Sequence, residues 1–416
     1  MQTEGGKLVE LDFIDKYKEK LAAIRRDIHK HPEQGWCEYR TTSIIVESLK
    51  KLGFNVFYGK DIIDEGSRNV VPSEEVLKYS KRRALEQGAS AEIVEAIHGG
   101  YTGAIGMLEC GEGPCTAFRF DIDCVMVDES TENSHTPYKE GFCSINGGLT
   151  HGCGHDGHIA IGLVFAEILA KNKDRLKGRI ILIFQPAEEG VRGAKSIINS
   201  GILPKIDYII GGHIGLSMKS LDWFSSGCYG FLATNKFDVK IYGNAAHAGN
   251  SPEKGKNAML AAANMVMSLH GISRHNDGAT RINVGKLTSG SFRSVIPEYA
   301  ELQVEVRGET DELNDFMYTS AVNLIDGIAK AYGVRYEIIP AGASISVESS
   351  EALEMKVKQA VEKLGIYKRV LSRAKVDCSE DFTFFMKHVT DNGGFATYLM
   401  WGSDIKNSFH NGNFDF

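Results

Sequence analysis

The segment 178–187, GRIILIFQPA, decides the fold class, because it is a short apolar run rich in isoleucine. Such a run is typical of a buried β-strand. Helical patterns at 157–172 and 191–200 lie on either side of it. Three more segments have the same strand-like composition: TAFRFDID (116–123), IDYIIGGH (206–213) and ATYLMWG (396–402). Because strands that alternate with helices form βαβ units, the sequence predicts an α/β fold with a mostly parallel sheet.

The chain of 416 residues is long enough for two domains, since a single hydrophobic core stops growing near about 250–300 residues. Near residue 231, segments begin to alternate apolar and polar residues, as in a half-exposed sheet. These segments are FLATNKFDVKIYG (231–243), ATRINVGKLTSG (279–290) and EYAELQVEVRGE (298–309), with helical patterns at 256–271 and 311–332. We predict a smaller α+β domain, 231–343, inserted into a larger domain formed by 1–230 and 344–416.

Two further helical patterns lie in the first hundred residues. Apolar residues recur with the helical period from Phe13 to Ile28, and this pattern ends at His31 and Pro32. The segment 61–98 is charged and helical in pattern. We expect it to form a separate excursion from the larger domain.

The charge and the cysteines restrict the class of protein. A net charge of −7 at pH 7 argues against a nucleic-acid or anionic-membrane surface, which needs a basic patch. Neither the apolar region of a signal peptide nor an apolar run of about 18 residues is found in the sequence. The eight cysteines are scattered without paired spacing, which is typical of reduced thiols. We expect a soluble, cytoplasmic protein that binds neither nucleic acid nor membrane.

The segment 148–158, GLTHGCGHDGH, concentrates three histidines, a cysteine and an aspartate between glycines. Polar residues between glycines often form an ordinary turn. Thiolate and imidazole are also the preferred ligands of zinc-like ions, and glycines let the backbone fold tightly around an ion. Taken alone, the segment supports both interpretations.

More candidate ligands lie at the carboxyl ends of the predicted strands, where open α/β sheets bind their ligands. They are Asp121 and Asp123 after one strand, Glu188 and Glu189 after the next, His213 at the end of a third, and His410 after the last. Five donors are enough for two divalent ions that share a ligand: Cys153, His155, Glu189, His213 and His410. Glu188 then remains to accept a proton from the water that attacks an amide.

Each of these side chains also has an ordinary structural explanation. Cys153 could be a small buried apolar residue, although its spacing to His155 favours metal binding. The two glutamates could stabilise a helix start through its dipole, but a carboxylate pair behind a buried strand is poorly explained by solvation alone. His213 and His410 could be hydrogen-bonded histidines without function, and we expect His158 to be structural.

Six motifs, in this order, resemble the M20 metallopeptidase family, subfamily D, which comprises amidohydrolases of N-acyl amino acids. They are RFDIDCV (119–125), HGCGHDGH (151–158), FQPAEEG (184–190), GGHIG (211–215), YGNAAHAG (242–249) and SEDF (379–382). Five more segments resemble the subgroup that hydrolyses p-aminobenzoyl-glutamate: RRDIHKHPEQGWCEYRT (25–41), the inserted helical segment near 61–98, HIAIGLVFAEIL (158–169), QVEVRGE (303–309) and FHNGNFDF (409–416). The resemblance implies a di-metal catalytic domain and an inserted lid or dimerisation domain.

The resemblance also implies a role for each matching residue. Cys153 matches the bridging metal ligand, and the other ligands are matched by His155, Glu189, His213 and His410. Glu188 matches the general base, and Asp123 matches an aspartate that supports the ligands from behind.

Two residues of the inserted domain match substrate contacts. Arg307, which the sequence alone explains equally well as a surface cation, matches an arginine that holds a substrate carboxylate. His247 matches a histidine that binds substrate or the oxyanion, often in the partner's active site. Ser294 stands where relatives have asparagine, which weakens the assignment of a substrate-amide contact at that position.

These roles predict a metal-dependent amidohydrolase with two divalent ions, zinc being favoured by thiolate and imidazole and manganese by carboxylate. The expected reaction is cleavage of an N-acyl amino acid, foremost p-aminobenzoyl-glutamate, to p-aminobenzoate and glutamate. One alternative is an N-acyl-amino-acid deacylase with another pocket. The other is a noncatalytic metal-binding subunit, and the intact Glu188 argues against it. The expected partner is a second copy of the chain or a homologous subunit.

Overall fold

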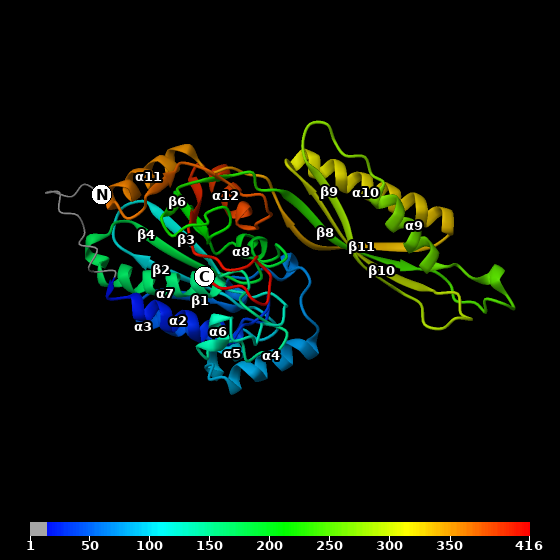
Figure 1. Ribbon diagram of the computed structural model, residues 1–416, viewed down its shortest axis with the longest axis horizontal. Coiled ribbons are helices and arrows are strands. Elements are labelled where there is room, and N and C mark those ends of the chain that lie inside the picture. The colour runs from blue at the N-terminus through cyan, green and yellow to red at the C-terminus, as the bar shows by residue number, and fades with distance from the viewer. Residues whose placement is uncertain (1–14) are drawn as a thin grey trace.

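A computed structural model describes residues 15–416, which form a larger and a smaller lobe (Figure 1). The larger lobe contains an eight-stranded sheet in the order β1-β2-β4-β3-β5-β14-β6-β12. Its central strands β4, β3, β5 and β14 are mutually parallel. The strands are β1 (Asn55–Tyr58), β2 (Ala104–Glu109), β3 (Cys115–Asp121), β4 (Arg179–Gln185), β5 (Tyr208–Ile214), β6 (Trp223–Ser225), β12 (Arg369–Leu371) and β14 (Phe395–Trp401). The predicted α/β fold with a mostly parallel sheet is confirmed.

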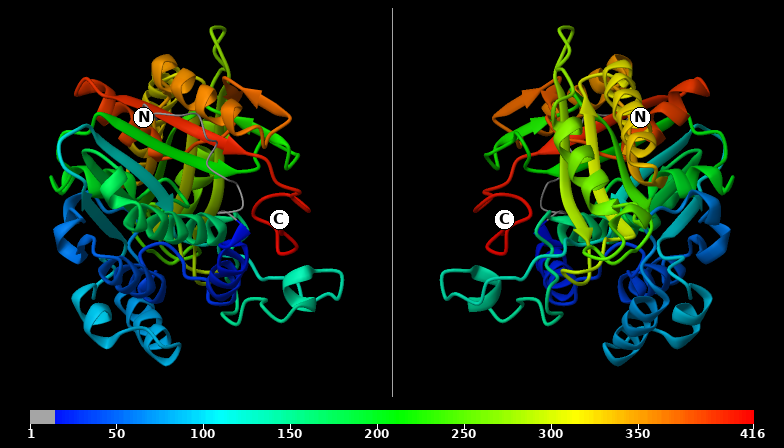
Figure 2. Two further views of the ribbon diagram at one scale, coloured as in Figure 1. Left: turned by 90° about the vertical axis from the view of Figure 1, so that its left-hand side faces the viewer. Right: turned by 90° about the vertical axis from the view of Figure 1, so that its right-hand side faces the viewer.

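Helices cover both faces of this sheet (Figure 1 and Figure 2). On one face lie α2 (Lys18–Lys30), α3 (Tyr39–Lys51) and α7 (His155–Lys171); on the other lie α8 (Ala194–Asn199), α11 (Glu351–Leu364) and α12 (Phe382–Asp391). Two hydrophobic cores, one on each face of the sheet, explain the apolar run in β4. Ile181 and Ile183 pack into the core with α8 and α12, whereas Ile180, Leu182 and Phe184 pack into the core with α3 and α7.

Smaller elements complete the larger lobe. The segment 61–98 contains two helices as expected, α4 (Glu74–Glu86), which Ser73 caps through its side chain, and α5 (Ala91–Ala96). A short helix, α6 (Thr136–Lys139), and a two-stranded ladder of β7 (Cys228–Tyr229) with β13 (Ala374–Lys375) also belong to it. The predicted first helix begins at Phe13, which lies outside the described residues, and α2 begins at Lys18.

The smaller lobe is a four-stranded antiparallel sheet in the order β11-β8-β10-β9. Its strands are β8 (Ala233–Tyr242), β9 (Thr280–Ser289), β10 (Tyr299–Gly308) and β11 (Arg335–Ser344), and α9 (Ala258–His270) and α10 (Asp311–Tyr332) cover one face. Alternate residues of β8 and β10, such as Phe237 and Val304, are buried under these helices. The opposite face is polar. The boundaries 231 and 343 remain our proposal, which the positions of β8 and β11 support.

The last strand of the smaller sheet contacts the larger lobe directly. The backbone N–H of Ala343 donates a hydrogen bond to the carbonyl oxygen of Val191 at 3.0 Å. A β-carbon at Gly342 would lie 2.1 Å from the carbonyl oxygen of Gly190, so only glycine permits this approach. We call this contact the strand joint. It fixes the end of β11 beside the loop that carries Glu189.

Two observations bear on the predicted class of protein. Within residues 15–416, no helix has both the length and the apolar character needed to cross a bilayer. All eight cysteines, which lie in the described part of the chain, are unpaired.

Candidate active site

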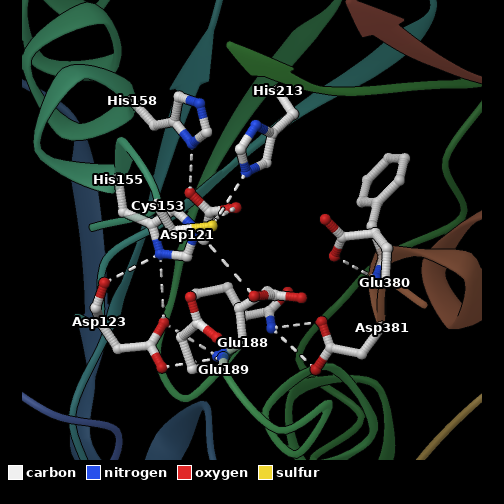
Figure 3. Close-up of polar contacts among 12 residues, drawn as sticks. Asp121, Asp123, Cys153, His155, His158, Glu188, Glu189, His213, Glu380 and Asp381 are labelled. Atoms are coloured by element: carbon white, nitrogen blue, oxygen red, sulfur yellow. Dashed lines mark hydrogen bonds and ion pairs between the residues drawn. The ribbon is translucent and has the colours of Figure 1, made fainter. Parts of the chain in front are cut away.

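The histidine-rich segment turns into α7 at the carboxyl ends of the central strands. Gly154 adopts a φ of 87°, a left-handed conformation that glycine tolerates without strain, and α7 begins at His155. The turn aims Cys153 and His155 at the ends of β3 and β5 (Figure 3). His213, on β5, approaches from the other side, and the sulfur of Cys153 lies 3.5 Å from its Nε2.

His213 is held with one ring nitrogen directed into the cluster. Its Nδ1 donates a hydrogen bond to the carbonyl oxygen of Ile214 at 2.7 Å, which leaves Nε2 without a proton in the neutral ring. Burial lowers the pKa of His213 to about 3, so the ring is neutral near pH 7. An unprotonated imidazole nitrogen beside a thiol is the arrangement that a zinc-like ion binds.

His155 presents its Nε2 to the same place. Its Nδ1 is hydrogen-bonded to the carbonyl oxygen of Asp123 at 2.9 Å. The buried Nε2 has no hydrogen-bond partner among the described residues, and it lies 4.0 Å from the Oε2 of Glu188. A buried polar atom without a partner is costly, and coordination of an ion by this nitrogen would satisfy it.

Asp123 positions the glutamate pair that follows β4. Its two carboxylate oxygens accept hydrogen bonds from the backbone N–H groups of Glu188 and Glu189, each at 3.0 Å. Ala187, directly before the pair, has a φ of 52°, a conformation that is uncommon for a residue with a side chain. The aspartate therefore stabilises a tight turn that aims both glutamates at the cluster, as Figure 3 shows.

The predicted ligands form two overlapping groups of donors. Cys153, His155 and His213 offer atoms that all lie within 4.8 Å of one another, and so do Cys153, Glu189 and His410. The Oε1 of Glu189 lies 3.3 Å from the Nε2 of His410 but has no hydrogen-bond partner within residues 15–416. Thiolate, imidazole and carboxylate groups beside unsatisfied buried atoms would suit the binding of zinc-like ions.

Charge pairing holds these donors together. Burial raises the pKa of Glu189, but contact with His410 and the charge of His155 outweigh it and lower this pKa to about 2. Burial likewise disfavours the charged form of His155, yet Asp121 and Asp123 raise its pKa to about 10. A metal ion would have to displace the proton of His155 on binding.

Glu188 differs from its neighbour in its tendency to hold a proton. Burial raises its pKa well above the ordinary value, and the charges of Glu380 and Glu189 raise it further. A raised pKa makes the carboxylate a stronger base, which suits Glu188 to accept a proton from a reacting molecule.

Sequence reasoning missed a buried network behind Glu188. The guanidinium of Arg119 donates hydrogen bonds to Asp121 at 2.6 Å, Glu380 at 2.9 Å and Asp381 at 3.2 Å. Asp381 in turn accepts bonds from the backbone at the start of α8. Both motifs, RFD and SEDF, are visible in the sequence, but Arg119 and Glu380 are 261 positions apart, and no pattern pairs them.

A cavity of about 340 Å³ opens beside the donor groups. Arg307 of β10 lines it, as do Cys153, Glu188, His213 and His410. A second cavity of about 590 Å³ shares Glu189 and His410 with the first and extends along the polar face of the smaller sheet. The sequence-predicted cation thus lines the same cavity as the predicted base and four of the five predicted ligands.

Comparison with known proteins identifies the family. The model of the family described as Peptidase family M20/M25/M40 matches residues 117–416. This chain belongs to that family. An indole-3-acetyl-aspartic acid hydrolase of Enterobacter agglomerans is 40% identical over 407 residues, covering 97% of this chain and 93% of the relative.

Two other M20-like proteins are similar over most of their length. A subunit of the p-aminobenzoyl-glutamate hydrolase of Escherichia coli (strain K12) is 40% identical over 406 residues, covering 97% of this chain and 93% of that protein. The crystal structure of an aminobenzoyl-glutamate utilization protein from Klebsiella pneumoniae has a TM-score of 0.84 and 36% identity, and the match covers 95% of this chain and 94% of that one. The predicted metal-dependent amidohydrolase is confirmed.

His247 lies far from the donor groups of this M20 chain. Its loop follows β8 at the end of the smaller lobe that points away from the larger lobe (Figure 1). Lys236 lines the cavity, and the six residues from there to Tyr242 span roughly 20 Å at about 3.3 Å per residue. His247 is exposed, and its Nδ1 accepts hydrogen bonds from the backbone N–H groups of Gly249 and Asn250. The structure therefore does not bring His247 to the site of its own chain.

His158 has no free ring nitrogen. Its Nδ1 is bonded to Asp121 at 2.5 Å, and its Nε2 accepts a hydrogen bond from the backbone N–H of Ile214 at 3.0 Å. The contacts agree with the structural role expected for it.

Proposed function

We propose that this M20 amidohydrolase hydrolyses the amide bond of an N-acyl acidic amino acid, with p-aminobenzoyl-glutamate as substrate. The observation that carries the proposal is one cavity lined by four of the five metal donors, by Glu188 and by Arg307. The names of two relatives support the substrate class, since p-aminobenzoyl-glutamate and indole-3-acetyl-aspartic acid are both amides of acidic amino acids.

We assign five residues to two divalent ions: Cys153, His155, Glu189, His213 and His410. Cys153 belongs to both donor groups, which favours a bridging role for its sulfur. The ions would supply positive charge that polarises the amide carbonyl and makes water more acidic. Asp123 would keep Glu189 and His155 in place through its backbone and side-chain contacts.

Glu188 is assigned as the general base. Its carboxylate would take a proton from the attacking water and pass it to the amide nitrogen as the bond breaks. The raised pKa supports this role, because a carboxylate with a higher pKa is a stronger base toward water.

Arg307 is assigned to a carboxylate of the amino-acid part of the substrate. Its side chain is 29% exposed and, among residues 15–416, donates one hydrogen bond, to Glu305 at 2.9 Å. The fork of the guanidinium still has N–H groups for a carboxylate, which arginine binds with two parallel hydrogen bonds.

His247 is assigned to the oxyanion or substrate of a partner's active site. Its exposed position at the far end of the smaller lobe supports this assignment, because that position is remote from the donor groups of its own chain. The partner would be a second copy or a homologous subunit, in line with the Escherichia coli relative, which is named as one subunit of a hydrolase. The inserted domain would then act in dimerisation, and the enzyme would be cytoplasmic.

The first prediction concerns metal content. Purified protein is expected to carry up to two equivalents of zinc or manganese by elemental analysis, and Cys153→Ser to carry clearly less, because the sulfur belongs to both donor groups. Cys378→Ser is a matched control, since this thiol lines the same cavity but belongs to neither donor group. Full metal content in Cys153→Ser, or activity that a chelator leaves unchanged, would contradict the assignment.

The second prediction concerns the substrate. In a panel of N-acyl amino acids, kcat/KM is expected to be highest for p-aminobenzoyl-glutamate and lower for conjugates of neutral amino acids, because Arg307 binds a carboxylate and an acidic conjugate offers two of them. A preference for a neutral conjugate would identify a different deacylase. No turnover of any conjugate by metal-loaded protein with its partner would identify a noncatalytic subunit.

A further inference from the structure

A second cation lies beside Arg307 on the polar face of the smaller sheet. Lys236 of β8 lines the same cavity of about 340 Å³, together with Glu188 and His410. In the antiparallel register, Lys236 is opposite Glu305, and Arg307 is two residues further along β10. Because alternate residues of a strand share a face, all three side chains stand on the side of the sheet opposite α9 and α10.

Glu305 lies between the two cations and forms a hydrogen bond with only one of them. Its Oε1 accepts a hydrogen bond from Arg307 at 2.9 Å, whereas the Nζ of Lys236 is 3.6 Å from the same oxygen. The second distance is too long for a hydrogen bond. Within residues 15–416 the ammonium of Lys236 makes no hydrogen bond, although its side chain is only 28% exposed. Three N–H donors therefore remain for a ligand in the cavity.

An acidic amino acid brings two negative charges into this cavity. Its walls are already rich in carboxylates, since Glu188, Glu189 and Glu380 all line it. A second carboxylate without its own cation would pay the full cost of desolvation near these like charges. One guanidinium neutralises one carboxylate, so the second charge needs a second cation.

We propose that Lys236 binds the side-chain carboxylate of the acidic amino acid, while Arg307 binds its α-carboxylate. Lys236 is then the residue that selects glutamate or aspartate conjugates over neutral ones. This inference rests on the proposed function. Glu305 keeps the two cations in place in the free protein and gives up part of its contact when the substrate carboxylates arrive.

The test compares two substrates that differ in one charge, p-aminobenzoyl-glutamate and p-aminobenzoyl-glutamine. In Lys236→Gln, kcat/KM for the glutamate conjugate is expected to fall by roughly 10-fold or more, mainly through KM, because a charged hydrogen-bond partner is lost. The value for the glutamine conjugate should change by less than about 2-fold. Lys236→Arg should retain the preference for glutamate, since it keeps the charge.

Lys240→Gln provides a matched control. Lys240 is on the same strand and the same face, but it is opposite Glu301 and does not line either cavity. Its replacement should leave both substrates unaffected, which separates a local effect from a change in overall charge.

Two outcomes would overturn the inference. Either the glutamate preference is unchanged in Lys236→Gln, or both conjugates lose activity equally, as expected for a merely structural residue. Calorimetry with free glutamate and free glutamine on metal-loaded protein gives a second measurement that needs no turnover. If wild-type protein hydrolyses neither conjugate, the proposed function fails. Loss of the preference for glutamate in the calorimetry of Lys236→Gln would still support the assignment of Lys236. Wild-type protein that binds glutamate no more tightly than glutamine would overturn that assignment.

Discussion

Replacing Glu188 with glutamine is expected to lower turnover by roughly 100-fold or more, while the metal content stays at the wild-type level. The amide keeps the size of the side chain but cannot accept a proton from water. The backbone N–H of residue 188 would still bond to Asp123, so the turn that holds Glu189 should persist. The measurements are kcat and elemental analysis on the same preparation.

Glu189→Gln is the control for this experiment. It alters the adjacent carboxylate, which belongs to a donor group with Cys153 and His410, so metal content should fall together with activity. Near-normal turnover in Glu188→Gln would leave Glu188 as a neighbour of the site without a part in proton transfer.

The replacement of His247 by alanine is expected to lower kcat by roughly 100-fold or more without changing metal content or folding. An oxyanion donor acts only on the reacting molecule, and His247 has no contact with the donor groups of its own chain. Measurement of kcat beside metal stoichiometry and thermal unfolding separates these effects. His275→Ala is a control, because His275 also belongs to the smaller lobe but is assigned no contact with substrate.

A mixed dimer tests which chain His247 serves. If it acts in the partner's site, a dimer of one Glu188→Gln chain and one His247→Ala chain contains one complete site. Part of the activity should therefore return on mixing and subunit exchange. A demonstrated mixed dimer that stays inactive would place His247 outside the partner's site.

The central strands of the larger sheet and three strands of the smaller sheet were predictable from sequence, whereas the edges of the larger sheet and β11 were not. Strands β3, β4, β5 and β14 are buried on two faces, which gives each a continuous apolar run. Strand β11 lacks such a signal, because Pro340 interrupts it and argues against a strand. The structure accommodates Pro340 at the edge of the sheet, with a register shift between Pro340 and Gly342.

The same distinction applies to the site. The candidate ligands were found because thiol, imidazole and carboxylate groups follow predicted strands, and parallel strands bring their carboxyl ends together. Arg119 and Lys236 were not identified from the sequence, because each contacts side chains that come close only when the sheets have folded. The alternation in β8 and β10 did contain the signal for the pair of Lys236 with Glu305, but the register between the strands was needed to use it.

The strand joint has a consequence for the kinetics of metal exchange. A swing of the smaller lobe that breaks the bond between Ala343 and Val191 would remove a backbone contact of the loop that begins with Glu188 and Glu189, although the N–H groups of both glutamates stay bonded to Asp123. Opening of the lobes would then increase the mobility of the loop that carries Glu189, a proposed metal ligand. Ions should leave faster from protein whose lobes are free to open, and a bound product that holds the lobes together should slow their escape. Gly342→Ala, which forces the joint apart, should speed metal loss even though position 342 contacts no ligand.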